Sequence, residues 1–546
     1  MASRGDNLSG FFNLYRHGFA RVALATPLVR IGDPMANAAA TLALMREAAG
    51  KKAVVAVFPE LGISAYSCED LFHQQALLRA SEAALQWLLA RSKGLALAAF
   101  VGLPVAVDGQ LYNCAALICR GRLLGVVPKT YLPNYREFYE LRQFTPAGEV
   151  AKEISFAGQS TFFGSLLFRL KEQPRLVLFA EICEDLWVPV PPSSYAALAG
   201  ATVIANLSAS NVVIGKHQYR KELAANQSAR CIAAYLYSAA GAGESTTDLA
   251  WDGHAMAFEN GSLLAESERF SRQAQLTLAD LDLERLEADR MRQNSFGESA
   301  RRHAAQVARF KTIDFSLPLF KGTLHLQRKI ERFPYVPGDP ATRDARCEEV
   351  YRIQVEGLAT RLRATGTKKL VIGVSGGLDS TQALLVGARV MDDLGLPRSN
   401  ILAYTMPGFA TSTRTRSSAW QLMRAVGASA EEIDIRPSCM QMFKDMGHPY
   451  AKGRKQYDIA FENVQAGERT SHLFRLANHH GGLVVGTGDL SELALGWSTY
   501  GVGDHMSHYN VNVSVPKTLI QYLIGWVAKS GQFNETVSKA LARVLT

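Results

Sequence analysis

Three side chains of different chemistry, a carboxylate, an amine and a thiol, each follow a short apolar run in the first half of the sequence. They are Glu60, Lys129 and Cys183. A thiol has an ordinary pKa of about 8.5, so a nearby carboxylate can serve as the base that activates it. An ammonium group can stabilise the oxyanion that forms when the thiol attacks a carbonyl carbon, and a covalent thioester follows. The set predicts acyl transfer, with Glu60 as base, Lys129 as oxyanion partner and Cys183 as nucleophile.

Each of the three residues also has a purely structural explanation. A cysteine at the end of a strand is most often a small core residue, Glu60 could cap a helix, and Lys129 could be a surface charge. Their common position favours the catalytic explanation, because we expect neighbouring strand ends to bring the three together. The strands predicted in this half are residues 53–58, 95–101, 123–127, 176–180 and 202–206, with a hairpin turn before 123 and a helix over 83–90.

A glycine-rich turn at 375–380, Ser-Gly-Gly-Leu-Asp-Ser, follows an apolar run and precedes a helical pattern. Such a turn presents backbone N–H groups at a helix N-terminus, which suits the phosphates of ATP. The usual ATPase signature has a lysine where this turn has Asp379. A carboxylate there makes sense only with a Mg²⁺ ion that bridges to phosphate. The spacing alone also allows an ordinary turn in which Asp379 or Ser380 caps the helix.

A second polar segment follows the apolar run at 483–486. Its Glu492 offers a second carboxylate for the metal, and the loop beyond carries Trp497 and Tyr500 among glycines. Aromatic rings in a polar loop suit stacking on a ring system. The same loop holds Asp504, His505 and His508. Because no further ligand lies in register, these three favour ordinary polar packing over a metal site.

Length, charge and cysteine usage limit the class of protein. At 546 residues the chain is too long for one core, so two large α/β domains or three smaller ones are expected. The net charge of +9 suits anionic substrates such as nucleotides, but no lysine-rich tail or basic-aromatic array indicates nucleic acid. Seven cysteines without a C-x-x-C pair argue for a reducing compartment. No apolar stretch suggests a signal peptide or a membrane span, so we expect a cytoplasmic protein.

The pattern along the chain predicts two α/β domains. The first domain is placed at 1–275 and the second at 341–546. Residues 276–340 are predicted to form a charged, proline-containing connector with a helix over 281–302. Strands alternate with helices in the second domain, which predicts a doubly wound parallel sheet with its site at the carboxyl ends of the strands. Its predicted strands are 370–374, 401–406, 432–435 and 483–486, and its predicted helices are 344–363, 412–426 and 461–478.

The strings around the three reactive residues resemble the nitrilase/amidase family. They are FPELG at 58–62, PKTYLPNY at 128–135 and EICEDLW at 181–187. The similarity spans roughly 20–269 and implies the family's α-β-β-α sandwich. It implies that Glu60 is the proton acceptor, Lys129 the oxyanion partner and Cys183 the nucleophile. Glu140 falls where the family often has a second, structural glutamate.

The segment NLSASNVVIGKHQYR at 206–220 resembles part of the synthetase-fused branch of that family. In that branch the segment binds the α-amino and α-carboxylate end of glutamine. Tyr135, Ser210 and Lys216 match its substrate-binding positions, so the resemblance implies that they bind glutamine. Many members of the branch carry arginine where this chain has Lys216. A cation is kept there without the bidentate fork that arginine provides.

The glycine-rich turn resembles the SGG-x-DS pyrophosphate loop of ATP-pyrophosphatase amidotransferases and adenylating synthetases. FENVQA at 461–466, GTGDLSELALGW at 486–497 and VPKTLI at 515–520 narrow the resemblance to the glutamine-dependent NAD(+) synthetase family of the long, two-domain bacterial type. The residues implied for ATP are Gly373, Val374, Ser375, Gly376, Gly377, Leu378, Asp379, Ser380 and Thr487. Those implied for deamido-NAD(+) are Asn463, Glu492, Trp497, Ser498, Thr499 and Tyr500, and those implied for Mg²⁺ are Asp379 and Glu492.

The resemblance implies a ligase with two linked reactions. The first half hydrolyses glutamine and supplies ammonia, and the second half adenylates deamido-NAD(+) with ATP before ammonia attacks it. The resemblance also implies a homo-oligomer and a sheltered path for ammonia. Two alternatives remain: another adenylating amidotransferase, which would share only SGG-x-DS, and a glutaminase whose impaired synthetase half serves as an assembly scaffold. The match stops near Thr546, whereas the family normally continues with a mobile segment over the second site. We therefore expect the chain as given to synthesise NAD(+) poorly and to release AMP without matching NAD(+).

Overall fold

The computed structural model describes residues 10–148, 151–409, 411, 413–496, 501–503 and 505–545. The chain forms two compact units, Met1–Lys329 and Ile330–Thr546, and each is described by itself. None of the helices in the described ranges combines the length and the apolar composition needed to cross a membrane.

The first unit contains an eight-stranded mixed sheet, in the order β14-β1-β2-β3-β4-β5-β7-β6. Its strands are β1 (Phe19–Thr26), β2 (Val55–Val57), β3 (Ala98–Val107), β4 (Gln110–Cys119), β5 (Arg122–Pro128), β6 (Lys152–Phe156), β7 (Gln159–Phe163) and β14 (Gln275–Asp282). Strands β4 and β5 pair antiparallel across a tight turn at Arg120 and Gly121, which is the predicted hairpin.

A seven-stranded sheet faces the first, in the order β13-β12-β11-β10-β9-β8-β15. Its strands are β8 (Leu166–Leu170), β9 (Val177–Ile182), β10 (Val203–Ser208), β11 (Ala234–Ala239), β12 (Ala255–Glu259), β13 (Ser262–Glu266) and β15 (Lys311–Phe315). Apolar side chains of both sheets, among them Phe100 and Phe168, form one buried cluster between them.

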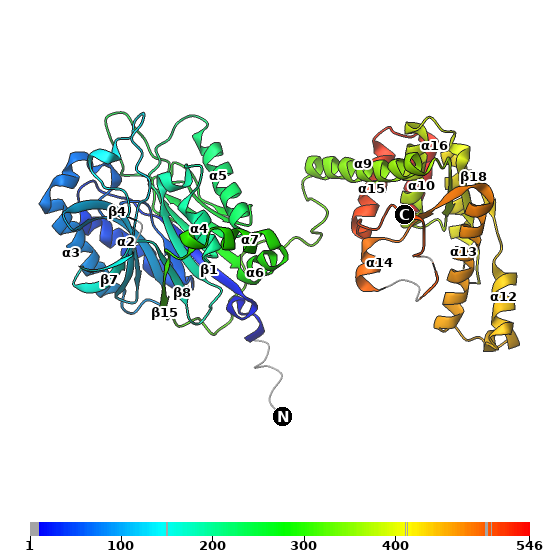
Figure 1. Cartoon of the computed structure of the whole chain (residues 1–546), viewed down its shortest axis with the longest axis horizontal. Helices are drawn as coiled ribbons and strands as arrows, with labels where there is room; N and C mark the ends of the chain where they lie inside the picture. The colour runs from blue at the N-terminus through cyan, green and yellow to red at the C-terminus, as the bar shows by residue number, and fades with distance from the viewer. Residues whose placement is uncertain are drawn as a thin grey trace, which may run out of the picture. The chain divides into compact units, whose positions relative to one another are not determined.

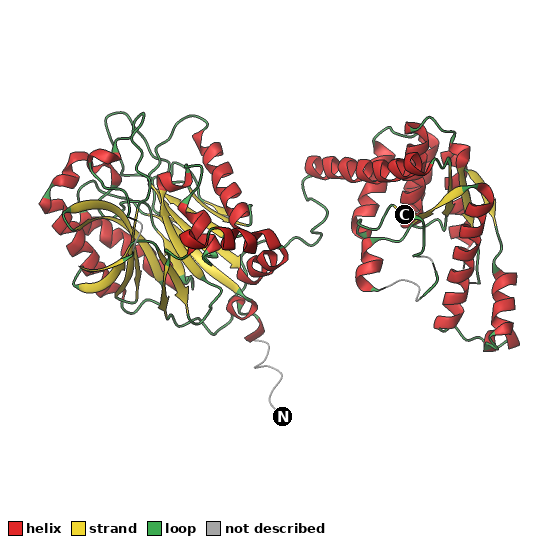
Figure 2. Cartoon of the chain, in the orientation of Figure 1, coloured by secondary structure: helices red, strands yellow, loops and turns green. Residues whose placement is uncertain are grey.

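Helices cover the outer faces of the two sheets (Figures 1 and 2). Helices α2 (Pro34–Gly50) and α3 (Gln75–Ser92) pack on the eight-stranded sheet. Helices α4 (Pro192–Leu198) and α5 (Lys216–Cys231) pack on the seven-stranded sheet. The four layers confirm the predicted α-β-β-α sandwich.

The first unit extends further than the predicted first domain. Residues 275–282 form β14, which pairs antiparallel with β1, and β15 pairs parallel with β8. Between them lie α6 (Leu283–Arg292), α7 (Asn294–Arg302) and α8 (Ala304–Val307), so the single helix expected over 281–302 breaks at Gln293. Leu281 and Phe315 are buried in the core between the sheets. Most of the segment expected to be a connector therefore completes the sandwich.

The second unit contains a five-stranded sheet, in the order β18-β17-β16-β19-β20, with every pair parallel. Its strands are β16 (Lys369–Gly373), β17 (Ile401–Thr405), β18 (Ser429–Glu432), β19 (Gly482–Gly486) and β20 (Tyr509–Asn510). Side chains that alternate along β16 point to opposite faces, with Ile372 in one core cluster and Val371 in the other.

Both faces of this sheet carry helices (Figure 1). One face packs against α9 (Pro340–Thr365), α10 (Leu378–Asp393), α11 (Thr413–Val426), α15 (Lys517–Lys529) and α16 (Glu535–Val544). The other face packs against α12 (Arg436–Asp445) and α13 (Ile459–His480), and a short helix α14 (Leu490–Leu495) follows β19. The arrangement confirms the predicted doubly wound parallel sheet.

The strand predicted at 432–435 is wrong. The edge strand β18 lies earlier, at Ser429–Glu432, and α12 begins at Arg436. The sequence of β18 is Ser-Ala-Glu-Glu and has no apolar run, because an edge strand needs to bury little of its surface.

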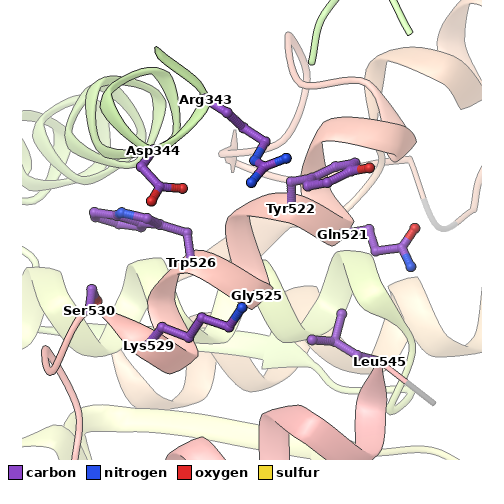
Figure 3. Close-up of a pocket in the computed structure, with 9 residues that line it drawn as sticks. All are labelled: Arg343, Asp344, Gln521, Tyr522, Gly525, Trp526, Lys529, Ser530 and Leu545. Carbon is purple, nitrogen blue, oxygen red and sulfur yellow. The ribbon is translucent and has the colours of Figure 1, made fainter. Parts of the chain in front are cut away.

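The surface of the second unit has a hollow of about 500 Å³ along the C-terminal half of α15. Arg343 of α9 and Tyr522, Gly525, Trp526 and Lys529 of α15 line it (Figure 3). This mixture of aromatic and charged side chains does not indicate a particular ligand or reaction. We assign no function to this hollow.

Candidate active sites

The cysteine predicted as nucleophile lies on a strained turn. Cys183 is the first residue of the short helix η4 (Cys183–Leu186), directly after β9, and its φ is 42°. Side chains with a Cβ atom rarely adopt this left-handed conformation, and such strain is typical of functional turns. Burial and the charge of Glu60 raise the pKa of the Cys183 thiol to about 12, although Lys129 opposes this shift. The thiol is therefore protonated at neutral pH and needs a base.

The predicted base and oxyanion partner form a buried ion pair. Lys129 Nζ lies 2.7 Å from Glu60 Oε1 and 2.8 Å from both carboxylate oxygens of Glu140. Asn113 Nδ2 donates to Glu60 Oε1 and the backbone N–H of Ala209 donates to Glu60 Oε2. Burial alone would lower the pKa of Lys129, but Glu140 and Glu60 outweigh it and hold the pKa well above its usual value. The ammonium group is thus fixed in its charged form.

The three residues come from both sheets of the sandwich. Glu60 and Lys129 follow β2 and β5 of the eight-stranded sheet, whereas Cys183 follows β9 of the seven-stranded sheet. The expectation of neighbouring strands is wrong, since β3 and β4 separate β2 from β5. The sheets meet at this point, because the backbone N–H of Glu60 donates to the carbonyl of Ser208 at the end of β10. Face-to-face packing of the sheets, rather than adjacency within one sheet, brings the residues together.

Asp185 joins the two sides of this site, and its role was not predicted. Its side chain is buried and accepts hydrogen bonds from the backbone N–H of Ile182, Thr130 and Tyr131. The carboxylate thereby ties the turn of Cys183 to the segment that follows Lys129. The motif EICEDLW contains Asp185, but a residue type alone does not show that its partners are backbone groups.

Two of the predicted glutamine-binding residues, Tyr135 and Ser210, adjoin groups that border or hold the predicted catalytic residues. Tyr135 Oη donates to Glu184 Oε1 at 2.9 Å, and Glu184 directly follows Cys183. Burial and the bond to Glu184 raise the pKa of Tyr135 to about 12. Ser210 is buried and directly follows Ala209, whose N–H holds Glu60. Tyr135 is therefore bonded to the residue after Cys183, and Ser210 follows the residue whose N–H holds Glu60.

Lys216, the third predicted glutamine-binding residue, begins α5. Its Nζ donates to Asn211 Oδ1 at 2.7 Å and lies over the rings of Phe138 and Trp187, at 5.2 and 5.5 Å from their centroids. Burial lowers the pKa of Lys216, while the nearby carboxylates of Glu137 and Glu184 oppose this shift. The structure thus places a cation against aromatic rings close to the nucleophile. Asn211, Phe138 and Trp187 were not predicted from the sequence.

The glycine-rich turn of the second unit joins β16 to α10. Gly376 has a φ of +84°, and a Cβ atom there would lie 2.6 Å from the carbonyl oxygen of Thr415. Gly377 is the N-cap residue of α10 and offers no side chain to the first N–H groups of that helix. Ser380 Oγ and Ser375 Oγ bond to each other and brace the turn. The geometry supports the predicted phosphate-binding turn.

The remaining predicted residues of the ATP set lie around this turn. Gly373 ends β16, and the buried Val374 donates its N–H to the carbonyl of Tyr404 in β17. Leu378 begins α10, and Thr487 follows β19. All of them therefore lie at the carboxyl ends of strands or in the helix start beyond, where ligands bind in open parallel sheets.

Asp379, Asp489 and Glu492 form a carboxylate triad. One oxygen atom of each lies within 4.8 Å of the others. Asp489 was not predicted; its Oδ1 also accepts from the backbone N–H of Glu492 and caps α14. Among the described residues, the buried Oδ1 of Asp379 has no hydrogen-bond partner. An all-oxygen donor set with one unused buried oxygen fits Mg²⁺.

A lysine lies at the centre of the carboxylate triad. Lys517 Nζ is 2.6 Å from Asp379 Oδ2, 3.0 Å from Asp489 Oδ2 and 3.2 Å from Glu492 Oε1. Burial raises the pKa of Asp379, whereas the ammonium group of Lys517 opposes this. The sequence string VPKTLI contains Lys517, but no role for it was predicted.

Asn512 links the two loops that carry the predicted ATP site. Its fully buried Nδ2 donates to the backbone carbonyls of Asp379 and Thr487, both at 2.9 Å. Gln354 Nε2 of α9 donates in turn to Asn512 Oδ1. These hydrogen bonds from side-chain amide groups fix the distance between the glycine-rich turn and the loop that carries Thr487. A lone asparagine in a sequence gives no signal for such a role.

The predicted deamido-NAD(+) residues are only partly described. Asn463 lies half-buried on α13, and Glu492 belongs to the carboxylate triad. Residues 497–500 lie outside the described residues. His508 packs as expected for a structural residue: its Nδ1 accepts from the N–H of Val484, and its ring lies against Phe474.

The folds and sites define a two-domain enzyme class, a thiol amidohydrolase joined to an ATP-dependent synthetase. Residues 21–291 match the carbon-nitrogen hydrolase family model, and residues 350–532 match the NAD synthase family model. The chain is 54% identical over 536 residues to the glutamine-dependent NAD(+) synthetases of Mycobacterium leprae (strain TN) and Mycobacterium tuberculosis (strain ATCC 25618 / H37Rv). Each match covers 98% of this chain and 79% of the relative. The chain belongs to the glutamine-dependent NAD(+) synthetase family.

More distant relatives extend the comparison. The glutamine-dependent NAD(+) synthetase of Thermotoga maritima is 30% identical over 508 residues, which cover 93% of this chain and 80% of the relative. A crystal structure of a glutamine-dependent NAD(+) synthetase from Cytophaga hutchinsonii is similar with a TM-score of 0.44 and 20% identity, over 97% of this chain and 84% of that one.

Proposed function

We propose that this enzyme converts deamido-NAD(+) to NAD(+), using ATP and ammonia released from glutamine. The observation that carries the proposal is the buried constellation of Glu60, Lys129 and Cys183 in a chain that also carries the triad beside a glycine-rich turn. The first site supplies ammonia and the second activates the acid that receives it. The division of labour follows the two units of the chain.

In the first unit, Glu60 takes the proton of the Cys183 thiol as the sulfur attacks the amide carbon of glutamine. The ammonium group of Lys129 stabilises the oxyanion. The carbon–nitrogen bond breaks, the proton returns from Glu60 to the leaving ammonia, and a thioester remains. Glu60 then takes a proton from the water that attacks the thioester, the carbon–sulfur bond breaks to release glutamate, and the proton passes from Glu60 to the leaving sulfur to restore the thiol. Tyr135, Ser210 and Lys216 hold the amino-acid end of glutamine, with the Lys216 cation suited to its carboxylate.

In the second unit, the nicotinate carboxylate of deamido-NAD(+) attacks the α-phosphorus of ATP, and pyrophosphate leaves. Ammonia then attacks the acyl-adenylate carbon, and AMP leaves as NAD(+) forms. The turn at 373–380 and Thr487 hold ATP. Asp379, Asp489 and Glu492 would hold Mg²⁺, which when bound neutralises phosphate charge. Asn463, Glu492 and residues 497–500 are proposed to lie along deamido-NAD(+).

The chemistry of ammonia favours a coupled assembly. Ammonia released into water at neutral pH becomes mostly ammonium, which is not a nucleophile, so transfer needs shelter from solvent.

We propose that the enzyme acts as a homo-oligomer, which light scattering of the purified protein would test. Its seven cysteines are all free, which supports a reducing compartment such as the cytoplasm.

The decisive experiment measures AMP and NAD(+) in a reaction that contains ATP, Mg²⁺, glutamine and deamido-NAD(+). We expect AMP to form only when deamido-NAD(+) is present, because adenylation needs its carboxylate. AMP formation without deamido-NAD(+) would contradict the proposed substrate. Glutamine hydrolysis without any AMP would instead favour a glutaminase with a non-catalytic second unit.

A further inference from the structure

A cation of the chain itself occupies the centre of the carboxylate triad. The ammonium group of Lys517 contacts one oxygen atom of each triad member, at 2.6 to 3.2 Å. The oxygen atoms that could bind a metal lie within 4.8 Å of one another. A metal ion held by these three side chains would meet the like charge of this ammonium group at close range, so the two cations compete for the carboxylate triad.

The place of Lys517 in its helix is otherwise unfavourable. It is the first residue of α15, where the positive end of the helix dipole repels a cation. Its backbone N–H is satisfied by Ser491 Oγ, so the local hydrogen bonds do not require a lysine here. The three ion pairs with the carboxylate triad offset the repulsion, which indicates that the triad holds the side chain in place.

The carboxylate triad in turn needs a cation. The side chain of Asp489 is fully buried, and one buried oxygen of Asp379 has no hydrogen-bond partner among the described residues. Converging carboxylates of like charge destabilise a fold unless an opposite charge lies among them. The lysine supplies that charge in a protein without metal.

We propose that Lys517 takes the place of the metal in the ATP-free enzyme. Its ammonium group neutralises the carboxylate triad there and is displaced when Mg²⁺ enters with ATP. The inference rests on the proposed function of the triad as the metal site. Displacement frees an ammonium group on a flexible four-carbon stem, close to the glycine-rich turn. The phosphates of ATP then offer this ammonium group a new partner.

The consequence is cooperative binding of metal and nucleotide. Mg²⁺ alone must replace three ion pairs of Lys517 and leaves the displaced ammonium group without a partner. Mg²⁺ that arrives with ATP provides the phosphates as that partner, so the loss is compensated. Two ligands that share a displaced group in this way raise each other's affinity by the same factor. The free enzyme should therefore bind Mg²⁺ weakly.

Calorimetric titration of the nucleotide-free full chain with Mg²⁺ tests the proposal. Lys517→Met removes the competing charge, and we expect Mg²⁺ to bind this variant at least about tenfold more tightly than the unaltered protein. Lys517→Arg keeps a cation and should stay weak. Lys529→Met is the matched control, because Lys529 is an exposed lysine of the same helix, and it should leave Mg²⁺ affinity unchanged.

A second measurement uses the unaltered protein and does not depend on the folding of a variant. Lysines are acylated briefly with an N-hydroxysuccinimide ester, with and without Mg²⁺, and labelled peptides are quantified by mass spectrometry. We expect saturating Mg²⁺ to increase labelling of Lys517 several-fold and to leave Lys529 unchanged. Equal labelling of Lys517 with and without Mg²⁺ would overturn the proposal.

The outcomes also separate this inference from the proposed function. Mg²⁺ affinity in Lys517→Met that equals or falls below that of the unaltered protein would show that the lysine does not compete, and would overturn the inference alone. Mg²⁺ binding that is unaffected by Asp379→Asn would instead show that the triad is not the metal site. The AMP assay remains an independent test of the overall reaction.

Discussion

Lys129 Nζ and Glu60 Oε1 lie 2.7 Å apart, and solvent reaches neither side chain. The proposed base and oxyanion partner are therefore one buried ion pair, and Glu140 joins it at 2.8 Å from the same ammonium group. Removal of one member of a buried pair leaves an uncompensated charge in a medium that solvates it poorly. Folding and catalysis in the first unit thus depend on the same contact.

Lys129→Met should lose glutamine hydrolysis and also lower the free energy of unfolding of the first unit by about 3–5 kcal/mol. The reason is that Glu60 and Glu140 would remain buried without a cation. Urea denaturation followed by circular dichroism measures the change. Lys152→Met serves as control, because its pair with Asp108 is exposed and should contribute less than about 1 kcal/mol. Similar losses in both variants would contradict the prediction.

Cys183→Ala should abolish NAD(+) synthesis from glutamine and leave synthesis from added ammonium salts largely intact. The second site needs only ammonia, whatever its source. Parallel assays with glutamine and with ammonium chloride measure the two rates. Cys231→Ala, which removes a buried thiol outside the site, should keep both rates. If Cys183→Ala still hydrolysed glutamine, another residue would have to be the nucleophile.

Members of one catalytic unit should not contribute additively. Glu60→Gln combined with Cys183→Ala should be scarcely slower in glutamine hydrolysis than Cys183→Ala alone, because the base has no function without the thiol. Steady-state glutamate production in the two single variants and the double variant measures this. A double variant slower by the product of the two single effects would show that the residues act independently.

The rate of alkylation of Cys183 should rise steadily with pH. Burial raises the pKa of this thiol to about 12, so the protonated form dominates at neutral pH and the thiolate fraction grows about tenfold per pH unit below that value. Iodoacetamide labelling of the glutamine-free protein between about pH 7 and pH 10, quantified by mass spectrometry, should therefore show no plateau. A plateau near neutral pH would mean that the site stores a thiolate, and Glu60 would not be needed as a base.

Asp379→Asn should abolish AMP formation and leave glutamine hydrolysis in the first unit active. The substitution removes one charge from the carboxylate triad and one proposed ligand of Mg²⁺. Nucleotide chromatography measures AMP, and a coupled assay measures glutamate. Asp392→Asn, on the same helix but paired with Arg398, is the matched control and should keep AMP formation. Normal AMP formation in Asp379→Asn would make Asp379 a helix-capping residue.

Gly376→Ala should weaken ATP binding and destabilise the second unit more than Gly366→Ala. Both glycines have positive φ, so both substitutions strain the backbone by about 1–3 kcal/mol. Only at position 376 would the new Cβ also meet a backbone carbonyl, that of Thr415 at 2.6 Å, whereas nothing lies within 4 Å at position 366. Thermal unfolding and ATP titration of the two variants give the comparison. Equal effects would show that the glycine-rich turn can adjust.

Several strands with apolar runs could be predicted from the sequence, but β1 and β11 are buried along nearly their whole length and were not among the predicted strands. The apolar run at 176–180 overlaps β9 (Val177–Ile182), and the run at 401–406 contains β17 (Ile401–Thr405). The polar edge strand β18 was misplaced, because residues at an edge need little apolar surface. The strand β14 was missed, because its alternating residues precede a charged helix. It packs through long-range pairing with β1, which no local pattern reveals.

The candidate sites show the same limit at the level of single residues. The types of Glu60, Cys183 and Asp379, and their positions after apolar runs, are visible in the sequence. Asp185 and Asn512 act through hydrogen bonds to backbone groups of distant segments. Their residue types do not distinguish them from other buried polar residues. Such roles become visible only when the fold brings the segments together.

The origin of the first site from two facing sheets has a consequence for how the enzyme matures. Glu60 and Cys183 are far apart in the sequence and meet only when the sheets have packed, and folds rich in contacts of this kind form slowly. A chain whose sheets have formed separately would carry a thiol without its base. Hydrolytic activity is thus confined to the fully folded molecule. Nascent or partly unfolded chains would leave the glutamine pool of the cell untouched.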